Sequence, residues 1–128
     1  MAGDYLVDTH VVIKLLNGDE RSSELFNQSN SIYIPVIVAG ELFYGAENST
    51  RIHENHEIFD DFLSQYEIID VDLSIAEVYG RIKTQLKKDG MTIPENDLWV
   101  AATAIAYQFT LITYDQHYSK TNGLNVIS

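Results

Sequence analysis

Four carboxylates stand in or beside apolar segments, where an acidic side chain that only hydrates the surface is not expected. They are Asp8, Glu41, Asp97 and Asp115. Asp8 and Asp115 each follow an apolar run. Glu41 stands inside an apolar run, and Asp97 opens another. Because such runs become buried, each carboxylate needs a partner that offsets the loss of its hydration. These residues are therefore the candidates for catalysis.

A divalent cation would resolve the repulsion within a group of four carboxylates. Two carboxylates about 5 Å apart repel each other by about 3 kcal/mol in surroundings with an effective dielectric constant near ~20. Carboxylate oxygens are the ligands that Mg²⁺ and Mn²⁺ prefer. The sequence has no cysteine and shows no candidate pair of histidines, which disfavours Zn²⁺. The residue types therefore predict a Mg²⁺ or Mn²⁺ site.

Local structural roles are the alternative explanation for each carboxylate. Asp8 could cap the helix that follows it, and Asp97 could be stabilised by the positive end of its helix. Asp115 could be a turn residue. Glu41 lacks such an explanation, because it stands in the middle of an apolar helix.

The elements that must position these residues alternate between strands and helices. The apolar runs predict strands at 5–7, 31–34, 68–71, 109–114 and 124–127. Helices are predicted at 9–16, 35–44 with Pro35 in the first turn, 51–65, from Asp72 or Ser74 to Lys88, and across 97–106. Capping boxes are predicted at Ser74-x-x-Glu77 and at Thr92-Ile93-Pro94-Glu95. This order predicts an α/β fold, a central parallel sheet of about five strands covered by helices on both faces. Functional groups collect at the carboxyl ends of the strands in such a sheet.

Length and composition predict one globular domain spanning residues 1–128. No apolar run reaches the roughly 18 residues that a membrane span needs, and no export signal opens the chain. We therefore expect a cytoplasmic protein. The formal charge of -11 disfavours a general affinity for nucleic acids, which comes from lysine and arginine, and would favour a basic partner.

Four segments of the chain together resemble the motifs of PIN-domain ribonucleases, and of the VapC-type toxins among them. The segments are Leu6-Val7-Asp8-Thr9, Val38-Ala39-Gly40-Glu41-Leu42-x-x-Gly45, Ile93-Pro94-Glu95-Asn96-Asp97-Leu98-Trp99-Val100-Ala101-Ala102 and Leu111-Ile112-Thr113-Tyr114-Asp115. Each motif is weak alone, but the four in this order span essentially the whole chain. One departure is His10, where the family often has asparagine.

The resemblance implies a three-layer α/β/α fold, a Mg²⁺ or Mn²⁺ site and cleavage of RNA. The implied ligands are the four carboxylates, with Asp8 and Asp97 as the principal pair and the hydroxyls of Thr9 and Thr113 nearby. The implied substrate is tRNA or ribosomal RNA. The implied partners are a VapB-like antitoxin, whose tail occupies the active site, and a second copy of the chain in a homodimer.

Basic residues that could contact RNA are few, and most lie on one predicted helix. They are Lys14, Arg81, Lys83, Lys87 and Lys88. A local basic patch would answer the objection raised by the net charge, although a solvated helix face explains these residues equally well.

Competing functions lack the residues that they need. A phosphoacceptor receiver domain needs an acidic pair after the first strand, and Asp8 has no acidic neighbour. A phosphatase of the haloacid dehalogenase type needs Asp-x-Asp there, whereas Thr9 and His10 follow Asp8. A scaffold or antitoxin-type protein without catalysis is the third alternative.

Overall fold

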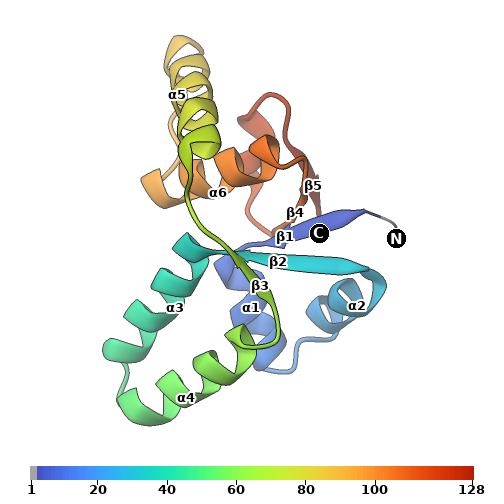
Figure 1. The fold of residues 1–128 in the computed structure, drawn as a ribbon, viewed down its shortest axis with the longest axis vertical. Helices are drawn as coiled ribbons and strands as arrows, with labels where there is room; N and C mark the ends of the chain where they lie inside the picture. The colour runs from blue at the N-terminus through green and yellow to red at the C-terminus, as the bar shows by residue number, and fades with distance from the viewer. Residues whose placement is uncertain (1–2) are drawn as a thin grey trace.

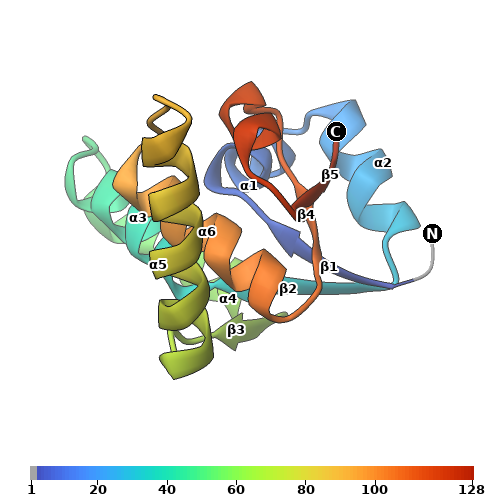
Figure 2. The ribbon, with the colours of Figure 1, turned by 90° about the horizontal axis from the view of Figure 1, so that it is seen from above.

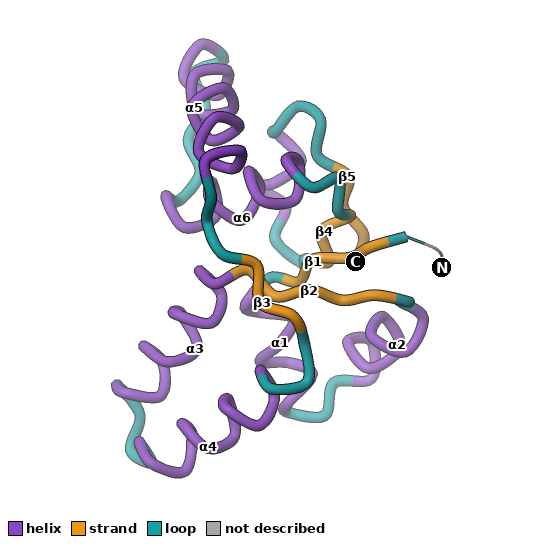
Figure 3. Tube along the Cα trace, viewed as in Figure 1, coloured by secondary structure: helices purple, strands orange, loops and turns teal. Residues whose placement is uncertain are grey.

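The parallel sheet expected from the apolar runs is present and has five strands. The structure is a computed structural model and describes residues 3–128. The strands are β1 (Asp4–Val7), β2 (Ser31–Pro35), β3 (Glu67–Ile69), β4 (Thr110–Ile112) and β5 (Asn125–Ile127). They lie in the order β3-β2-β1-β4-β5, and all neighbouring pairs are parallel. Figure 3 shows the strands in orange with β1 and β2 at the centre of the molecule.

Helices cover both faces of this sheet, as predicted. They are α1 (Thr9–Leu16), α2 (Glu20–Gln28), α3 (Val36–Glu47), α4 (Ile52–Leu63), α5 (Leu73–Lys88) and α6 (Glu95–Ala106), with a short 3-10 helix η1 (Gln116–Lys120). The helices α1 to α4 lie on one side, and α5 and α6 lie on the other (Figures 1 and 2). None of the helices within residues 3–128 combines the length and the apolarity of a membrane span.

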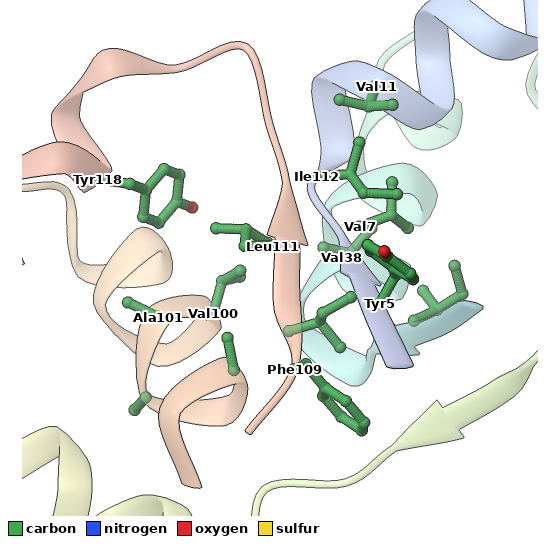
Figure 4. Packing of buried hydrophobic residues seen from close by; sticks show 14 of the residues in the cluster. Tyr5, Val7, Val11, Val38, Val100, Ala101, Phe109, Leu111, Ile112 and Tyr118 are labelled. Atoms are coloured by element: carbon green, nitrogen blue, oxygen red, sulfur yellow. The ribbon is translucent and has the colours of Figure 1, made fainter. Parts of the chain in front are cut away.

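Strand β4 is buried on both of its faces, which is why its sequence is apolar without alternation. Leu111 and Ile112 are fully buried. Figure 4 shows the Leu111 side chain directed toward α6 and the Ile112 side chain directed toward Val11 of α1. Full burial of an aliphatic side chain stabilises a fold by about 1.5–3 kcal/mol. Helix α6 contacts the sheet through small residues, among them Ala101, which is also fully buried.

The two predicted capping boxes are wrong. Of the two residues predicted to begin α5, Asp72 is confirmed as the cap, since its Oδ1 accepts a hydrogen bond of 3.0 Å from the backbone N–H of Ile75, and Ser74 is not the cap. Helix α6 is preceded by Pro94 and has no side-chain cap. The Glu95 carboxylate instead accepts a hydrogen bond from the Tyr79 hydroxyl and lies 3.3 Å from the Lys83 ammonium group. Contacts with α5 therefore replace the local hydrogen bonds that a capping box would make.

Several element boundaries also differ from the prediction. Pro35 ends β2 and immediately precedes α3, so it is not inside the first helical turn. Strand β3 ends at Ile69, so the predicted strand at 68–71 begins and ends too late. Helix α2 was not predicted, because its sequence is polar and it buries only Ser22 and Leu25.

Candidate active site

The pairing of β1 with β4 places Asp8 and Thr113 side by side. Val7 is paired with Ile112 in the sheet, and the backbone N–H of Asp8 donates to the Ile112 carbonyl at 3.1 Å. Asp8 Oδ2 accepts a hydrogen bond of 2.9 Å from Thr113 Oγ1, and Oδ1 accepts one of 2.9 Å from the backbone N–H of Thr9. The Asp8 side chain is thus buried, only 7% exposed, with both oxygens bound.

Thr9 connects Asp8 to the second candidate, Glu41. The Thr9 hydroxyl donates to Glu41 Oε1 at 2.7 Å. Glu41 lies in the second turn of α3, which follows β2, the neighbour of β1 in the sheet. A single hydroxyl at the start of α1 therefore fixes the carboxylate of a helix 32 residues further along the chain.

The other two carboxylates reach the same edge of the sheet by different routes. Asp97 lies in the first turn of α6. Because α6 leads into β4 and a connecting helix runs opposite to its strand, its first turn lies at the carboxyl edge. Asp115 follows β4, and its backbone N–H donates to Thr113 Oγ1 at 3.0 Å. Asp115 Oδ1 accepts a hydrogen bond of 2.9 Å from the backbone N–H of His117.

All four carboxylates line one hollow of about 220 Å³ at this edge. The lining residues are Asp8, Thr9, His10, Ile13, Glu41, Asp97 and Asp115. Thr113 lies beneath Asp8 and is buried. Within the described chain, neither lysine nor arginine lines the hollow. The expected convergence is therefore present, and it concentrates negative charge without a basic side chain to balance it.

Burial and mutual repulsion make two of these carboxylates hard to ionise. Burial raises the pKa of Asp8, and the hydrogen bonds from Thr113 and Thr9 oppose that rise. Burial, followed by the charge of Asp8, raises the pKa of Asp97 to about 6. The charges of Asp115 and Glu41 act in the same direction on both residues. A bound cation would remove the cause of this repulsion.

Two of the four carboxylates also cap a helix, but these capping hydrogen bonds leave their oxygens able to bind a further ligand. Asp8 does precede α1 and binds the N–H of Thr9, and Asp115 does precede η1 and binds the N–H of His117. Each carboxylate has about four lone-pair directions, so these bonds leave capacity for another ligand.

Two residues of η1 belong to the site and were not recognised in the sequence. His117, Asp97 and Asp115 each offer a ligand atom, and these atoms lie within 4.8 Å of one another. His117 Nδ1 also lies 3.1 Å from Asp115 Oδ1. The Tyr118 side chain is buried beside Asp97. The only signal for either residue was its closeness to Asp115 in the sequence.

The structure does not bring the predicted basic residues together at the carboxylates. Lys14 Nζ lies 5.5 Å from the centre of the Tyr114 ring. On α5, Lys83 and Lys87 line one surface hollow, whereas Arg81 and Lys88 line another. None of these five lines the carboxylate hollow. Their contact with RNA stays a prediction.

Comparison with known proteins places this arrangement in a family. The sequence model of the PIN domain family matches residues 5–124. The chain belongs to the PIN domain family. Its relatives place it among the VapC ribonucleases: it is 37% identical to "Ribonuclease VapC2" of Rickettsia felis over 113 residues, which are 85% of this chain and 84% of that protein. It is 27% identical to the "tRNA(fMet)-specific endonuclease VapC" of Salmonella typhimurium over 125 residues, or 95% of each chain.

Solved structures of the family have the same architecture as this PIN domain. The VapBC2 complex of Rickettsia felis, crystallised with a DNA fragment from its promoter, contains a chain that matches with a TM-score of 0.88 and 32% identity. The match covers 98% of both chains. The DNA-bound VapBC complex of Salmonella typhimurium matches with a TM-score of 0.90, at 25% identity and again with 98% coverage of both chains. The three-layer α/β/α arrangement expected from the motifs is therefore correct.

Proposed function

We propose that this PIN domain is a metal-dependent endoribonuclease and the toxin of a toxin–antitoxin pair. The observation that carries the proposal is the hollow shared by Asp8, Glu41, Asp97 and Asp115. Membership of the VapC ribonucleases supports the same activity. We propose the four carboxylates as the catalytic and metal-binding residues, with Thr9 and Thr113 in support.

The donor set of the hollow fits a hard divalent cation. It consists of carboxylate oxygens and a hydroxyl, with the imidazole of His10 in the lining and that of His117 close to Asp97 and Asp115. Oxygen donors suit Mg²⁺ and Mn²⁺, and imidazole is compatible with Mn²⁺. When bound, such a cation would activate a water for attack on a phosphodiester and offset the charge of the phosphoryl oxygens.

The chain's own residues hold the ligands in place for this chemistry. Thr113 and the N–H of Thr9 fix the two oxygens of Asp8, which lines the hollow. The Thr9 hydroxyl fixes one oxygen of Glu41. Such outer contacts determine the orientation of ligands and commonly affect activity almost as much as the ligands do.

The substrate and the partners follow from the relatives. We propose tRNA or ribosomal RNA as the substrate, because one relative carries a name specific for a tRNA. We propose a VapB-like antitoxin as the partner, because similar chains were solved as VapBC complexes. We also propose that residues 1–128 form a single domain. We propose further that the chain forms a homodimer and that it acts in the cytoplasm.

The proposal is tested by RNA cleavage with the purified chain. Total tRNA and ribosomal RNA are incubated with EDTA, Mg²⁺ or Mn²⁺, and the products are mapped. We expect cleavage only with a metal ion, and a loss of at least about 100-fold in Asp8→Ala and Asp97→Ala. Asp60→Ala is the control, because Asp60 is exposed on α4. Equal cleavage in EDTA, or full activity of both site variants, would contradict the proposal.

A further inference from the structure

Tyr118 has a buried hydroxyl without a hydrogen-bond partner. Its side chain is only 1% exposed, and the hydroxyl meets the geometry of a hydrogen bond with no group in residues 3–128. Figure 4 shows the ring on the α6 side of β4, near Leu111. Leaving a buried hydroxyl unpaired costs free energy, and phenylalanine would fill the same space without that cost. The hydroxyl therefore needs an explanation beyond packing.

Asp97 differs from the other three carboxylates of the hollow in its hydrogen-bond donors. Thr9 and Thr113 donate to Asp8, the Thr9 hydroxyl donates to Glu41, and the N–H of His117 donates to Asp115. Within residues 3–128, neither a backbone N–H nor a threonine hydroxyl donates to the Asp97 carboxylate, and the side-chain donor beside it is the Tyr118 hydroxyl. A buried hydroxyl without a hydrogen bond of good geometry thus lies beside the Asp97 carboxylate, which lines the hollow.

We propose that Tyr118 is a positioning residue, whose buried hydroxyl orients the Asp97 carboxylate for the binding of a divalent cation. This inference rests on the proposed function, because that function makes Asp97 a ligand of the cation. When one oxygen of Asp97 is bound to a cation, the other needs a donor that fixes its direction. The Tyr118 hydroxyl lies beside Asp97, and its hydrogen bond to the ionised carboxylate would be charge-assisted.

The electrostatics of the pair agree with this geometry. The Tyr118 hydroxyl is close enough to Asp97 to lower the pKa of that carboxyl, against the stronger effect of burial. Burial and the charges of Asp8 and Asp97 raise the pKa of the Tyr118 hydroxyl above its ordinary value. The hydroxyl therefore keeps its proton and remains a donor to the carboxylates.

The test compares wild type with Tyr118→Phe, which removes one oxygen and keeps the ring. The affinity for Mn²⁺ alone is measured by electron paramagnetic resonance, and RNA cleavage is measured as a function of the Mn²⁺ concentration. We expect Mn²⁺ to bind about 10-fold more weakly to Tyr118→Phe. We expect the cleavage rate to recover largely at saturating Mn²⁺, and the metal-free melting temperature to stay unchanged or to rise.

Tyr66→Phe is the matched control, because Tyr66 is a partly buried tyrosine that contacts Phe26 and Phe62 away from the hollow. It should bind Mn²⁺ as the wild type does. Equal Mn²⁺ affinities in Tyr118→Phe and wild type would overturn the role of Tyr118. So would a metal-free melting temperature lowered by about 5 °C or more, which would make the hydroxyl a folding determinant. Failure of the wild type to bind Mn²⁺ would instead overturn the proposed function.

Discussion

The four carboxylates differ in how the chain stabilises their charge. Both oxygens of Asp8 accept hydrogen bonds, one from Thr9 and one from Thr113. These bonds fix the side chain and oppose the rise in its pKa that burial causes. Asp97 accepts no hydrogen bond from a backbone N–H or a threonine of residues 3–128, and burial, followed by the charge of Asp8, raises its pKa to about 6. Substitutions at the two positions should therefore act differently on the metal-free protein.

Asp97→Asn should raise the melting temperature of the metal-free protein by a few degrees. The substitution removes a charge that is repelled by Asp8, and the amide of asparagine keeps an oxygen that can accept from the Tyr118 hydroxyl. It should also abolish stabilisation by Mn²⁺, which for wild type amounts to about 2.7 kcal/mol at a concentration 100 times Kd. Melting is followed by calorimetry in EDTA and in Mn²⁺.

Asp60→Asn is the control for that measurement, because Asp60 is exposed on α4. Asp8→Asn should not gain the same stability, because an amide nitrogen would face one of the donors on Thr9 and Thr113. Identical melting of the wild type in EDTA and in Mn²⁺ would argue against a metal site.

Acidification should stabilise the metal-free protein through Asp97. Its pKa is about 6 in the folded protein against an ordinary value of 3.8, so the folded state binds this proton more tightly than the unfolded state does. The contribution of Asp97 to the free energy of unfolding is therefore fully present below pH 3.8 and is lost as the pH rises through about 6. Other acidic groups titrate in the same range, so the quantity to measure is the difference in melting temperature between wild type and Asp97→Asn in EDTA. This difference should shrink from pH 7 to pH 5; a constant difference would contradict the repulsion.

The carboxylates were predictable from the sequence, and the residues around them were not. Asp8 and Glu41 stand out because their neighbours in the chain are apolar. Tyr118 lies between polar residues in a segment without periodicity, so its burial depends on contacts that form only in the fold. His117 is exposed and gave no sign of its place beside Asp97.

At the scale of elements, the end of β4 organises the site. Thr113 continues the sheet, since its backbone N–H donates to the Ile127 carbonyl of β5 at 3.1 Å. Its hydroxyl donates to Asp8 and accepts from the backbone N–H of Asp115. One buried side chain thus joins the ends of two strands and sets the spacing between two carboxylates.

Thr113→Val should lower both stability and activity. Valine has nearly the shape of threonine but leaves one oxygen of Asp8 and the N–H of Asp115 without their partner. The expected loss of stability is about 1–3 kcal/mol, measured by urea unfolding in EDTA. RNA cleavage should fall as Asp8 loses its fixed direction. Thr113→Ser keeps the hydroxyl and is the control; if it is impaired as much as the valine variant, the methyl group rather than the hydrogen bonds is responsible.

The sequence predicted elements best where an apolar pattern was continuous. The strands β1 and β4 and the helix α1 lie where expected. Helix α2 was missed because its sequence is polar, although Asp19 caps it by accepting from the backbone N–H of Ser22 at 3.0 Å. The capping box at Ser74 is wrong because Asp72 caps α5, and the one at Thr92 is wrong because Glu95 contacts Tyr79 and Lys83 of α5 instead.

At the scale of the whole molecule, the charge distribution sets a problem for an RNA-binding protein. The chain has a formal charge of -11. Four of its carboxylates gather in the hollow, and no lysine or arginine of residues 3–128 lines that hollow. The four carboxylates span residues 8–115, so only the sheet topology brings them together. Such a surface repels RNA until cations occupy the hollow, and it attracts cationic groups of any origin.

An arginine from an antitoxin's tail is a cation that suits this hollow. A planar guanidinium can bind carboxylates in a bidentate manner, and here it would meet Asp8 and Asp97 in a partly buried place. It would occupy the position of the metal ion, so inhibition should compete with Mn²⁺. Loss of the arginine should cost the complex about 2–5 kcal/mol, because buried charges would be left unpaired.

The test is to purify the chain with the partner encoded beside it and to measure the affinity of that partner for three forms of the chain. Asp97→Ala should bind the partner at least about 10-fold more weakly than wild type does, since about 1.4 kcal/mol corresponds to each tenfold change. Asp61→Ala should bind normally, because Asp61 is an exposed acid on α4 and changes the net charge by the same amount. Equal weakening by both variants would show that the partner senses the overall negative charge. Equal affinities of wild type and Asp97→Ala would show that the partner inhibits without entering the hollow. Only a loss of affinity specific to Asp97→Ala, together with weaker binding of the partner to the wild type in excess Mn²⁺, fits an arginine that competes with the metal ion.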